Sequence, residues 1–428
     1  MKTARSLVPL VLVLAIAGGL AWWQFLRRGT PPAGPPEVPI EQPLGDHPAL
    51  SDLADPPEWD ELEAWQDTIT REDFLRQLES VFTVSAAWRE WFHVGEKDVL
   101  IETGIDDGRF RLRFADEAPE RPAPREWRAA SEMAPAPPDL PLEGVRIAID
   151  PGHIGGRWAR IEERWFQIGD DAPVQEGDMT LRVARLLRPR LESLGASVSL
   201  VRNDTEPVTA YRPESLMDTA REIEPDSPQQ LAERLFYRTA EIRARARMVN
   251  ETLKPDLVLC LHFNAEAWGD PENPTLVPRH HFHLLVNGAY TDAEIALADQ
   301  RHHVVRKIVE GVHSEEATLA GAVAARFVRD TRLPPYLYEP NSRRALNIDN
   351  DPYVWARNLL ANRLYERPVV FLEPYVMNST LDYPRIQAGD YEGLREVDGK
   401  KRPSIFREYA DAVAAGLADH YREHRPAG

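Results

Sequence analysis

The sequence predicts an α/β fold, a twisted and mostly parallel β-sheet flanked by helices, with a small α+β module in front of it. Two observations lead to this fold class. From residue 143 onward, short apolar runs typical of buried strands alternate with segments of helical periodicity, an order typical of parallel sheets covered by helices on both faces. Before that point, two proline-rich stretches enclose a short segment with its own helix and strand patterns. The 428 residues are enough for two or three domains and at least one large core.

The N-terminus has the pattern of a membrane segment. Residues 6–26 carry no charge, and about 20 such residues span a bilayer. The run follows two basic residues, contains a pair of tryptophans near its end and stops at a pair of arginines, as at a membrane interface. We interpret residues 1–28 as an uncleaved signal anchor, with a cleaved signal peptide as the alternative. In both cases we expect the rest of the protein outside the cytoplasm, in the periplasm. The anchor would tether it to the inner membrane.

Proline content divides the region that follows. Residues 29–57 and residues 118–142 are rich in proline, which is typical of linkers. Between them, residues 58–117 form the predicted module, in which Thr70 is placed to cap a helix and two alternating stretches flank a turn, the pattern of a β-hairpin. The sequence does not indicate what this module binds. Residues 143–425 form the predicted large α/β domain.

The composition excludes some classes of function. The net charge is −18 and the pI is near 5.2, whereas proteins that bind nucleic acid cluster basic residues against the phosphates. We therefore expect no nucleic-acid partner. Cys260 is the single cysteine, which rules out an intramolecular disulfide and an all-cysteine metal site. A zinc site in this chain would use histidines and carboxylates.

Three apolar stretches of the large domain end in an ionisable residue. IAIDPGH ends in His153, LVLCLH ends in His262 and VVFLE ends in Glu373. In open α/β sheets, binding sites form beyond the carboxyl ends of the strands. A buried histidine or glutamate needs a hydrogen bond, a charge partner or a metal. Three such residues at equivalent strand ends therefore predict a common site.

Glu176 is a fourth candidate, because it stands where a helix begins after the first of these strands. We place the N-cap of that helix at Asp178. A helix entry lies at the same edge of the sheet as the strand ends, so Glu176 can reach His153 and His262. Two histidines and one glutamate with an open fourth position are a common catalytic zinc arrangement. Zinc lowers the pKa of its water to around 7, and Glu373 is then the candidate general base.

In these residues and their order, the chain resembles the zinc-dependent N-acetylmuramoyl-L-alanine amidases, which cut bacterial peptidoglycan. The family has an apolar strand that runs into Asp-Pro-Gly-His-Gly-Gly, a zinc-binding Glu at the next helix, and a strand ending in Thr-Arg, matched here by Arg202. It also has an Arg-rich helix before Ser-Ile-His-Ala-Asn-Ala, and a catalytic Glu soon followed by Ser-Asn, matched by Glu373 and Asn378. The likeness covers residues 143–421. Ile154 departs from the pattern, but no ligand position is lost.

The resemblance implies a fold related to the zinc carboxypeptidases. It also implies an enzyme that hydrolyses the amide between N-acetylmuramic acid and L-alanine in peptidoglycan. It assigns His153, Glu176 and His262 as ligands of one Zn²⁺, and Glu373 as the catalytic residue. Two alternatives stay open. Another zinc peptidase of wall peptides would differ only in its pocket, whereas a non-catalytic wall-binding regulator would not need this complete set of residues.

Further residues are candidates for binding substrate or for orienting loops: Asn264, Arg202 and Asn378. Asn264 follows the predicted ligand His262 closely, and Arg202 is placed to anchor a strand end. His281 and His283 stand two residues apart on one face of a predicted strand. They would line the cleft or, as is more common for such pairs, lie at the surface.

Residues 291–310 form a predicted amphipathic helix. Some members of the family hold a helix over the zinc until an activator protein binds, and here Glu294 or Asp299 would supply the blocking carboxylate. The alternative is a surface insertion that only packs on the sheet.

Overall fold

The computed structural model describes residues 50–104, 108–118, 124–339 and 342–427. The predicted anchor, residues 1–28, and most of the first linker lie outside these ranges. Within the ranges, no helix is both long enough and apolar enough to cross a bilayer.

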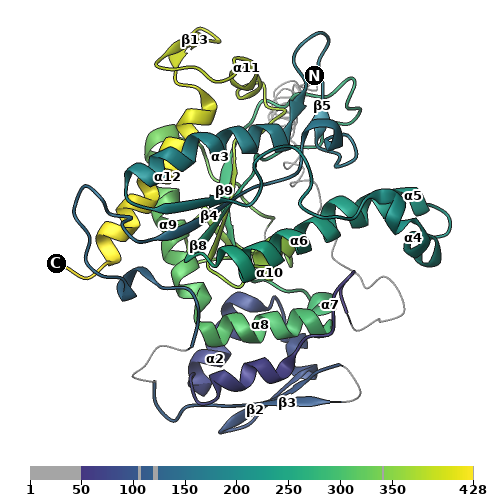
Figure 1. Cartoon of the computed structure of the whole chain (residues 1–428), viewed down its shortest axis with the longest axis vertical. Coiled ribbons are helices and arrows are strands. Elements are labelled where there is room, and N and C mark those ends of the chain that lie inside the picture. The colour runs from purple at the N-terminus through teal and green to yellow at the C-terminus, as the bar shows by residue number, and fades with distance from the viewer. Residues whose placement is uncertain (1–49, 105–107, 119–123, 340–341, 428) are drawn as a thin grey trace, which may run out of the picture.

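A seven-stranded sheet forms the centre of the molecule (Figure 1). From one edge to the other, its strands are β10 (Leu346–Asn347), β11 (Val354–Ala356), β9 (Phe282–Val286), β12 (Val369–Pro374), β8 (Leu257–Leu261), β4 (Arg146–Pro151) and β7 (Ser197–Leu200). β7, β4, β8 and β12 are parallel neighbours, whereas β9 is antiparallel to β12 and parallel to β11. The predicted fold class, a mostly parallel sheet flanked by helices, is confirmed.

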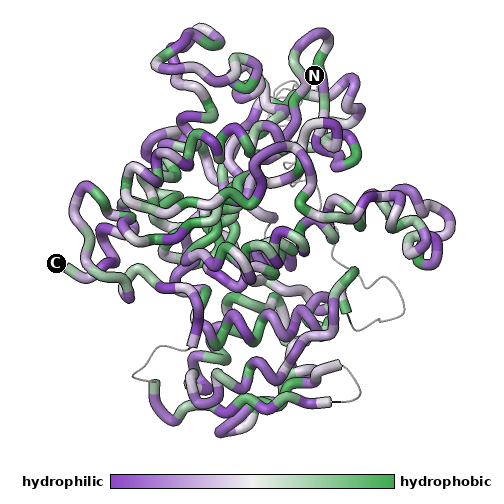
Figure 2. Tube along the Cα trace, viewed as in Figure 1, coloured by the Kyte–Doolittle hydropathy of each residue, from purple (hydrophilic) through white to green (hydrophobic). Residues whose placement is uncertain are grey.

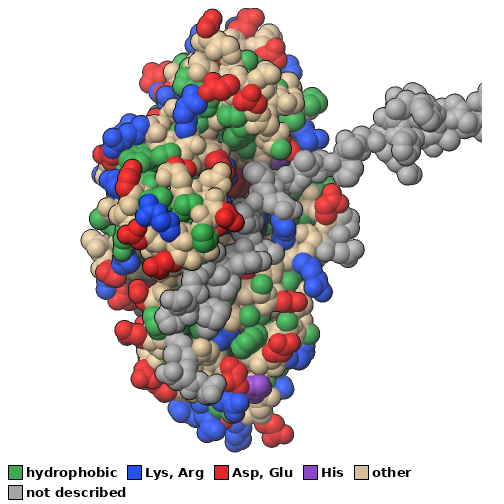
Figure 3. All heavy atoms as spheres, turned by 90° about the vertical axis from the view of Figure 1, so that its right-hand side faces the viewer, with side chains coloured by type: hydrophobic (Ala, Val, Ile, Leu, Met, Phe, Trp, Pro, Cys, Tyr) green, Lys and Arg blue, Asp and Glu red, His purple; other side chains and the backbone are tan. Residues whose placement is uncertain are grey.

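Helices cover both faces of this sheet. One face carries α3 (Glu176–Ser193), α9 (Val312–Thr331) and α12 (Ile405–His424), and the other carries α6 (Glu241–Arg247) and α10 (Leu360–Leu364). Figure 1 shows α4 (Met217–Ile223) and α5 (Pro228–Arg234) extending to one side. On the face that carries these two helices, acidic and basic side chains are interspersed (Figure 3).

The alternation of side chains along the strands explains this layering. Successive residues of a strand point to opposite faces. In β8, Leu259 therefore packs on the side of α3, α9 and α12, whereas Cys260 packs on the side of α6 and α10. In β12, Leu372 and Phe371 divide in the same way. Figure 2 shows the apolar residues gathered along these central strands.

The predicted α+β module is present beneath this domain (Figure 1). Its helical segments are η1 (Trp59–Trp65), α2 (Arg71–Gln77), η2 (Leu78–Phe82) and η3 (Ala86–Glu90), and its strands are β1 (Phe92–Val94), β2 (Asp98–Glu102) and β3 (Arg109–Arg113). Thr70 caps α2 as predicted, because its hydroxyl accepts the N–H of Asp73. β2 and β3 form the predicted antiparallel hairpin. β1 extends it to three strands.

The segment predicted as one amphipathic helix forms two, α7 (Asp292–Ile295) and α8 (Ala298–Glu310). α8 is buried on more than one side, because the module packs on it through η1, α2 and η2 while α9 and α10 pack on it from the large domain. His302, for example, is only 4 % exposed. The helix therefore joins the two parts of the molecule.

Both predicted linkers contain residues that pack in the described ranges. Ser51 is buried and donates its N–H to the carboxylate of Asp299. In the second stretch, the Trp127 side chain is buried and donates to Glu310, and Arg128 forms an ion pair with Asp256. Proline content alone misses these contacts. The limits drawn between domains stay predictions.

The remaining short elements connect these parts. They are η4 (Ala130–Glu132), η5 (Gly156–Trp158), β5 (Trp165–Phe166), β6 (Val174–Gln175), η6 (Pro213–Leu216), η7 (Leu235–Ala240), η8 (Met248–Leu253), α11 (Tyr383–Gln387), β13 (Arg395–Val397) and β14 (Lys400–Arg402).

Candidate active site

The turn after β4 depends on glycine in two places. Gly155 has φ +80, and a Cβ there would lie 2.5 Å from the carboxylate of Asp178. At Gly152, a Cβ would lie 2.2 Å from the ring of His262. Only glycine allows this backbone to pass so close to a neighbouring helix and ring. The turn carries His153, itself in the left-handed region with φ 57.

Asp150 fastens this turn to the helix beneath it. Its carboxylate accepts hydrogen bonds from Arg245 at 2.9 Å and from the hydroxyl of Tyr365 at 2.5 Å. Arg245, on α6, also donates to the carbonyl of His153 at 2.9 Å and pairs with Glu241. Asp150, at the end of β4, therefore has a structural role: it fixes the backbone that presents His153.

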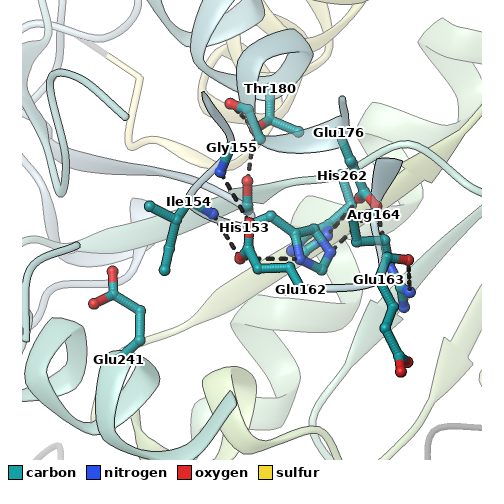
Figure 4. Close-up of polar contacts among 12 residues, drawn as sticks. His153, Ile154, Gly155, Glu162, Glu163, Arg164, Glu176, Thr180, Glu241 and His262 are labelled. Carbon is teal, nitrogen blue, oxygen red and sulfur yellow. Dashed lines mark hydrogen bonds and ion pairs between the residues drawn. The ribbon is translucent and has the colours of Figure 1, made fainter. Parts of the chain in front are cut away.

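The three predicted metal ligands lie together (Figure 4). Oε2 of Glu176 is 3.2 Å from Nε2 of His153, and Oε1 is 2.9 Å from Nδ1 of His262. One ligand atom from each residue lies within 4.8 Å of the others. α3 begins at Glu176 with Gln175 as its N-cap. The predicted cap at Asp178 is thus wrong: its carboxylate instead accepts the N–H of Gly156.

This donor set fits a metal ion such as zinc. Two imidazoles and a carboxylate are its usual protein ligands in catalytic sites. Glu176 is 2 % exposed. Burial alone would raise its pKa, but the adjacent imidazoles of His153 and His262 hold the pKa of the Glu176 carboxyl well below its usual range. The charged carboxylate that a cation requires is therefore favoured in place.

Glu162 is a member of this cluster that sequence reasoning missed. Its carboxylate accepts the N–H of Ile154 at 2.8 Å and of Gly155 at 2.9 Å, and it lies 3.6 Å from Nδ1 of His153 (Figure 4). Carboxylates in this position orient metal-binding histidines. In the sequence, nothing distinguishes Glu162 from its neighbour Glu163.

Glu373 ends β12 on the same edge of the sheet and lines the same pocket as the three predicted ligands. Burial and the nearby charge of Glu176 raise the pKa of Glu373 to about 8. A cation bound between these carboxylates would oppose both effects. The ring of His262 stacks on Phe371 at a centroid distance of 4.3 Å, which fixes the ring beside Glu373.

The pocket has a volume of about 350 Å³. Its walls come from the strand ends, from α6 and from residues 357–361 and 363, and its apolar lining includes Leu285 and Phe371. The cavity therefore extends from the ionisable cluster along the sheet face that α6 and α10 cover.

The three loop-orienting candidates hold backbone in place. Arg202 donates to the carbonyl oxygens of Pro151, Gly152 and Gly177, and so joins the turn after β4 to α3. Asn378 accepts the N–H of Glu266 and donates to the carbonyl of Thr275.

Asn264 lines the pocket. Its side-chain oxygen accepts the N–H of Ala265, and its side-chain nitrogen faces Nδ1 of His281 and of His283. The surface position preferred for these two histidines is wrong: they are 6 % and 1 % exposed, and His283 lines the pocket. In the sheet register, His283 is the partner of Glu373.

The two predicted blocking carboxylates have other partners. Glu294 lines the pocket, but its carboxylate accepts the N–H and the hydroxyl of Thr291 in a capping box at the start of α7. Asp299 accepts from Ser51 and lines a separate hollow beside the module. A blocking role for either residue stays a prediction.

Comparison with known proteins identifies the family. The model of one family, described as N-acetylmuramoyl-L-alanine amidase, matches residues 147–392. The chain belongs to this family. The matched stretch contains all four residues of the predicted centre, and the module lies outside it. A search of curated proteins finds no match.

Solved structures of amidases are also similar to this chain. They include Ami1 from Mycobacterium smegmatis (15 % identity over 66 % of this chain and 99 % of that one, TM-score 0.37). CwlD from Clostridioides difficile, in complex with the GerS lipoprotein, has 14 % identity over 65 % of this chain and 100 % of that one, TM-score 0.37. AmiC2 from Nostoc punctiforme has 14 % identity over 66 % of this chain and 98 % of that one, TM-score 0.34.

Proposed function

We propose that this amidase uses zinc to hydrolyse the amide bond between N-acetylmuramic acid and L-alanine in peptidoglycan, and that it works in remodelling the cell wall. The observation that carries the proposal is the convergence of His153, Glu176 and His262 beside Glu373 in one pocket of a chain from this family. The family supplies the substrate class, and the pocket supplies the donor set for the metal.

Each residue of the centre has a separate task. His153, Glu176 and His262 would hold the ion, which would act as a Lewis acid and lower the pKa of water. The carboxylate of Glu373 takes the proton from the attacking water and then gives it to the nitrogen of the leaving L-alanine. The stacking of Phe371 on His262 and the N–H bonds of Glu162 keep the rings oriented through this cycle.

Product analysis tests the function. The purified protein, incubated with cell wall, should release stem peptides with a free L-alanine amine, and chelation should stop the release. Cleavage within the stem peptide instead would identify the other candidate, a zinc peptidase. Binding to wall without any cleavage would identify a regulator.

We further propose that the enzyme acts in the periplasm, tethered to the inner membrane by residues 6–26. The uncharged length of this segment supports an anchor. An activator protein is part of the same proposal. CwlD, one of the similar structures, was solved together with a lipoprotein, so a partner of this chain is worth testing in pull-down experiments from membranes.

A further inference from the structure

Arg357 is a buried cation that opens into the amidase pocket. Arg357 is 8 % exposed and lines the same cavity as Glu373. Among the described residues, no carboxylate forms an ion pair with its guanidinium. A buried charge that has no carboxylate in contact with it costs several kcal/mol as a rule. The cavity therefore presents a site that an anion from outside would complete.

Other arginines on the pocket wall differ from Arg357. Arg245 pairs with Asp150 and Glu241, and Arg234 pairs with Glu224. These contacts neutralise their charges within the protein. The phenol of Tyr338 interacts with the Arg357 guanidinium but supplies no counter-charge, because burial raises the pKa of Tyr338 and keeps the phenol neutral.

The backbone of Arg357 is held from both sides. Its N–H donates to the carbonyl of Val286 at 3.0 Å, which continues the pairing of β11 with β9, and its carbonyl accepts from the side chain of Asn362 at 3.0 Å. A side chain that extends from a fixed backbone loses less entropy when it binds a ligand. The backbone from which the Arg357 side chain extends is thus fixed at the pocket wall.

The pocket joins Arg357 to the catalytic end. Along the paired strands, the lining passes from Glu373 and its partner His283 to Phe371 and its partner Leu285, and then to Arg357. On β9, His283 pairs with Glu373, and Val286 pairs with Ala356, the residue before Arg357. These two levels are three residues apart, which is roughly 10 Å along the strand at about 3.3 Å per residue. An extended peptide covers this distance in two to three residues.

We propose that Arg357 binds a carboxylate of the stem peptide, on the second or third residue after the bond that is cut. The proposal rests on the proposed function and deepens it by naming a determinant of substrate specificity. A guanidinium matches a carboxylate in a bidentate pair. In peptidoglycan stems, glutamate linked through its side chain leaves its main-chain carboxylate free at the second residue, and a diamino acid can present one at the third.

The test crosses enzyme variants with substrates. Muropeptides carry either a free carboxylate or a carboxamide at the second residue, and a second pair differs in the same way at the third. The variants are Arg357→Gln and Arg357→Lys. Arg234→Gln is the matched control, because Arg234 lines the same pocket but its charge is already paired with Glu224. kcat and KM are measured for each combination.

We expect the unaltered enzyme to prefer the free carboxylate at one of the two positions by about 10- to 100-fold in kcat/KM, mainly through KM. Arg357→Gln should remove this preference, Arg357→Lys should keep part of it and Arg234→Gln should keep it fully. The position at which the preference disappears identifies which residue carries the carboxylate.

Two outcomes would overturn the inference and leave the amidase function standing. One is equal turnover of carboxylate and carboxamide substrates by the unaltered enzyme, which needs no variant to fold. The other is a fall in activity of Arg357→Gln that is the same for every substrate, as expected for a purely structural residue. If no muropeptide is cleaved, the proposed function itself fails. Calorimetry then compares how tightly the protein binds the free tripeptide in its acid and amide forms. Tighter binding of the acid form would support a carboxylate site at Arg357, and equal binding would contradict it.

Discussion

Glu162 lies 3.6 Å from Nδ1 of His153, the ring nitrogen that does not face Glu176. The carboxylate also accepts two backbone N–H groups of the turn. It therefore fixes both the orientation of the ring and the path of the backbone that carries it.

The first prediction concerns this contact. Glu162→Gln replaces one acceptor oxygen with an N–H₂ group, so the side chain can no longer accept from both N–H groups and face the ring. We expect zinc affinity to fall by about 10- to 100-fold, measured by competition with a chelator of known affinity. Glu163→Gln is the control, because Glu163 is the exposed neighbour. Equal affinities of the two variants would show that Glu162 does not orient the ligand.

The second prediction is that metal and activity disappear together. His153→Ala, Glu176→Ala and His262→Ala each remove one donor from the cluster, so each purified variant should contain far less zinc than the unaltered protein by elemental analysis. Stripping the unaltered protein with a chelator should abolish wall cleavage, and added zinc should restore it. Full activity of stripped protein would contradict a metal-dependent mechanism.

The third prediction separates the base from the ligands. Glu373→Gln keeps the shape of the side chain but cannot take the proton, so turnover should fall by roughly two to four orders of magnitude while zinc remains bound. Glu176→Ala provides the comparison, because it should lose both. If Glu373→Gln loses zinc as readily as that variant, Glu373 is a ligand.

The sequence alone predicts the residues of the site that stand at strand ends, but not those that reach it from loops. His153, His262 and Glu373 follow or end apolar strands. Because binding sites in open α/β sheets form beyond the carboxyl ends of the strands, this pattern predicts that the three residues share a site. Glu162 stands in an irregular segment, and Arg357 follows the short strand β11, which lies second from one edge of the sheet. Neither position has a periodicity that tells which side chains it meets, so only the tertiary structure brings them to the pocket.

The sequence indicates the position of a residue in a helix or strand better than it indicates its burial. His283 is in the predicted strand, but its surface placement is wrong because the pocket wall and Tyr336 enclose it. The amphipathic pattern of residues 291–310 correctly indicates helix, yet it cannot reveal that the module covers the polar side of α8. Contacts between distant segments determine both results.

The fourth prediction concerns pH. Burial lowers the pKa of His313 to about 4, whereas in the unfolded chain it lies near 6.5. Between these values only the unfolded chain takes up the proton, so the contribution of His313 to stability is present above pH 6.5 and is lost as the pH falls towards 4. His313→Gln should reduce this acid-dependent loss of unfolding free energy, on the order of 1–2 kcal/mol given partial exposure. Denaturant titrations at pH 7 and pH 4.5 measure it. An unchanged difference between the two pH values would contradict the assignment.

The last prediction concerns the tether. Ser51 is fixed on α8 through Asp299 and Gln300, so the stretch between the predicted anchor and the folded protein is residues 29–49. At about 3.1–3.6 Å per residue, this stretch spans roughly 65–75 Å at most. Deleting residues 30–44 should bring the amidase close to the membrane and out of reach of most of the wall.

In cells, we expect this deletion to lower wall cleavage while the protein still fractionates with membranes. The purified variant, whose described residues are unchanged, should hydrolyse soluble muropeptides at the rate of the parent, which serves as the control for folding. A replacement of the same length by a Gly/Ser sequence should restore reach only in part, because a flexible chain has a shorter average span than a proline-rich segment of equal length. Wall cleavage equal to that of the parent after the deletion, or a mature N-terminus found near Gly19, would show that residues 6–26 do not hold the enzyme at the membrane.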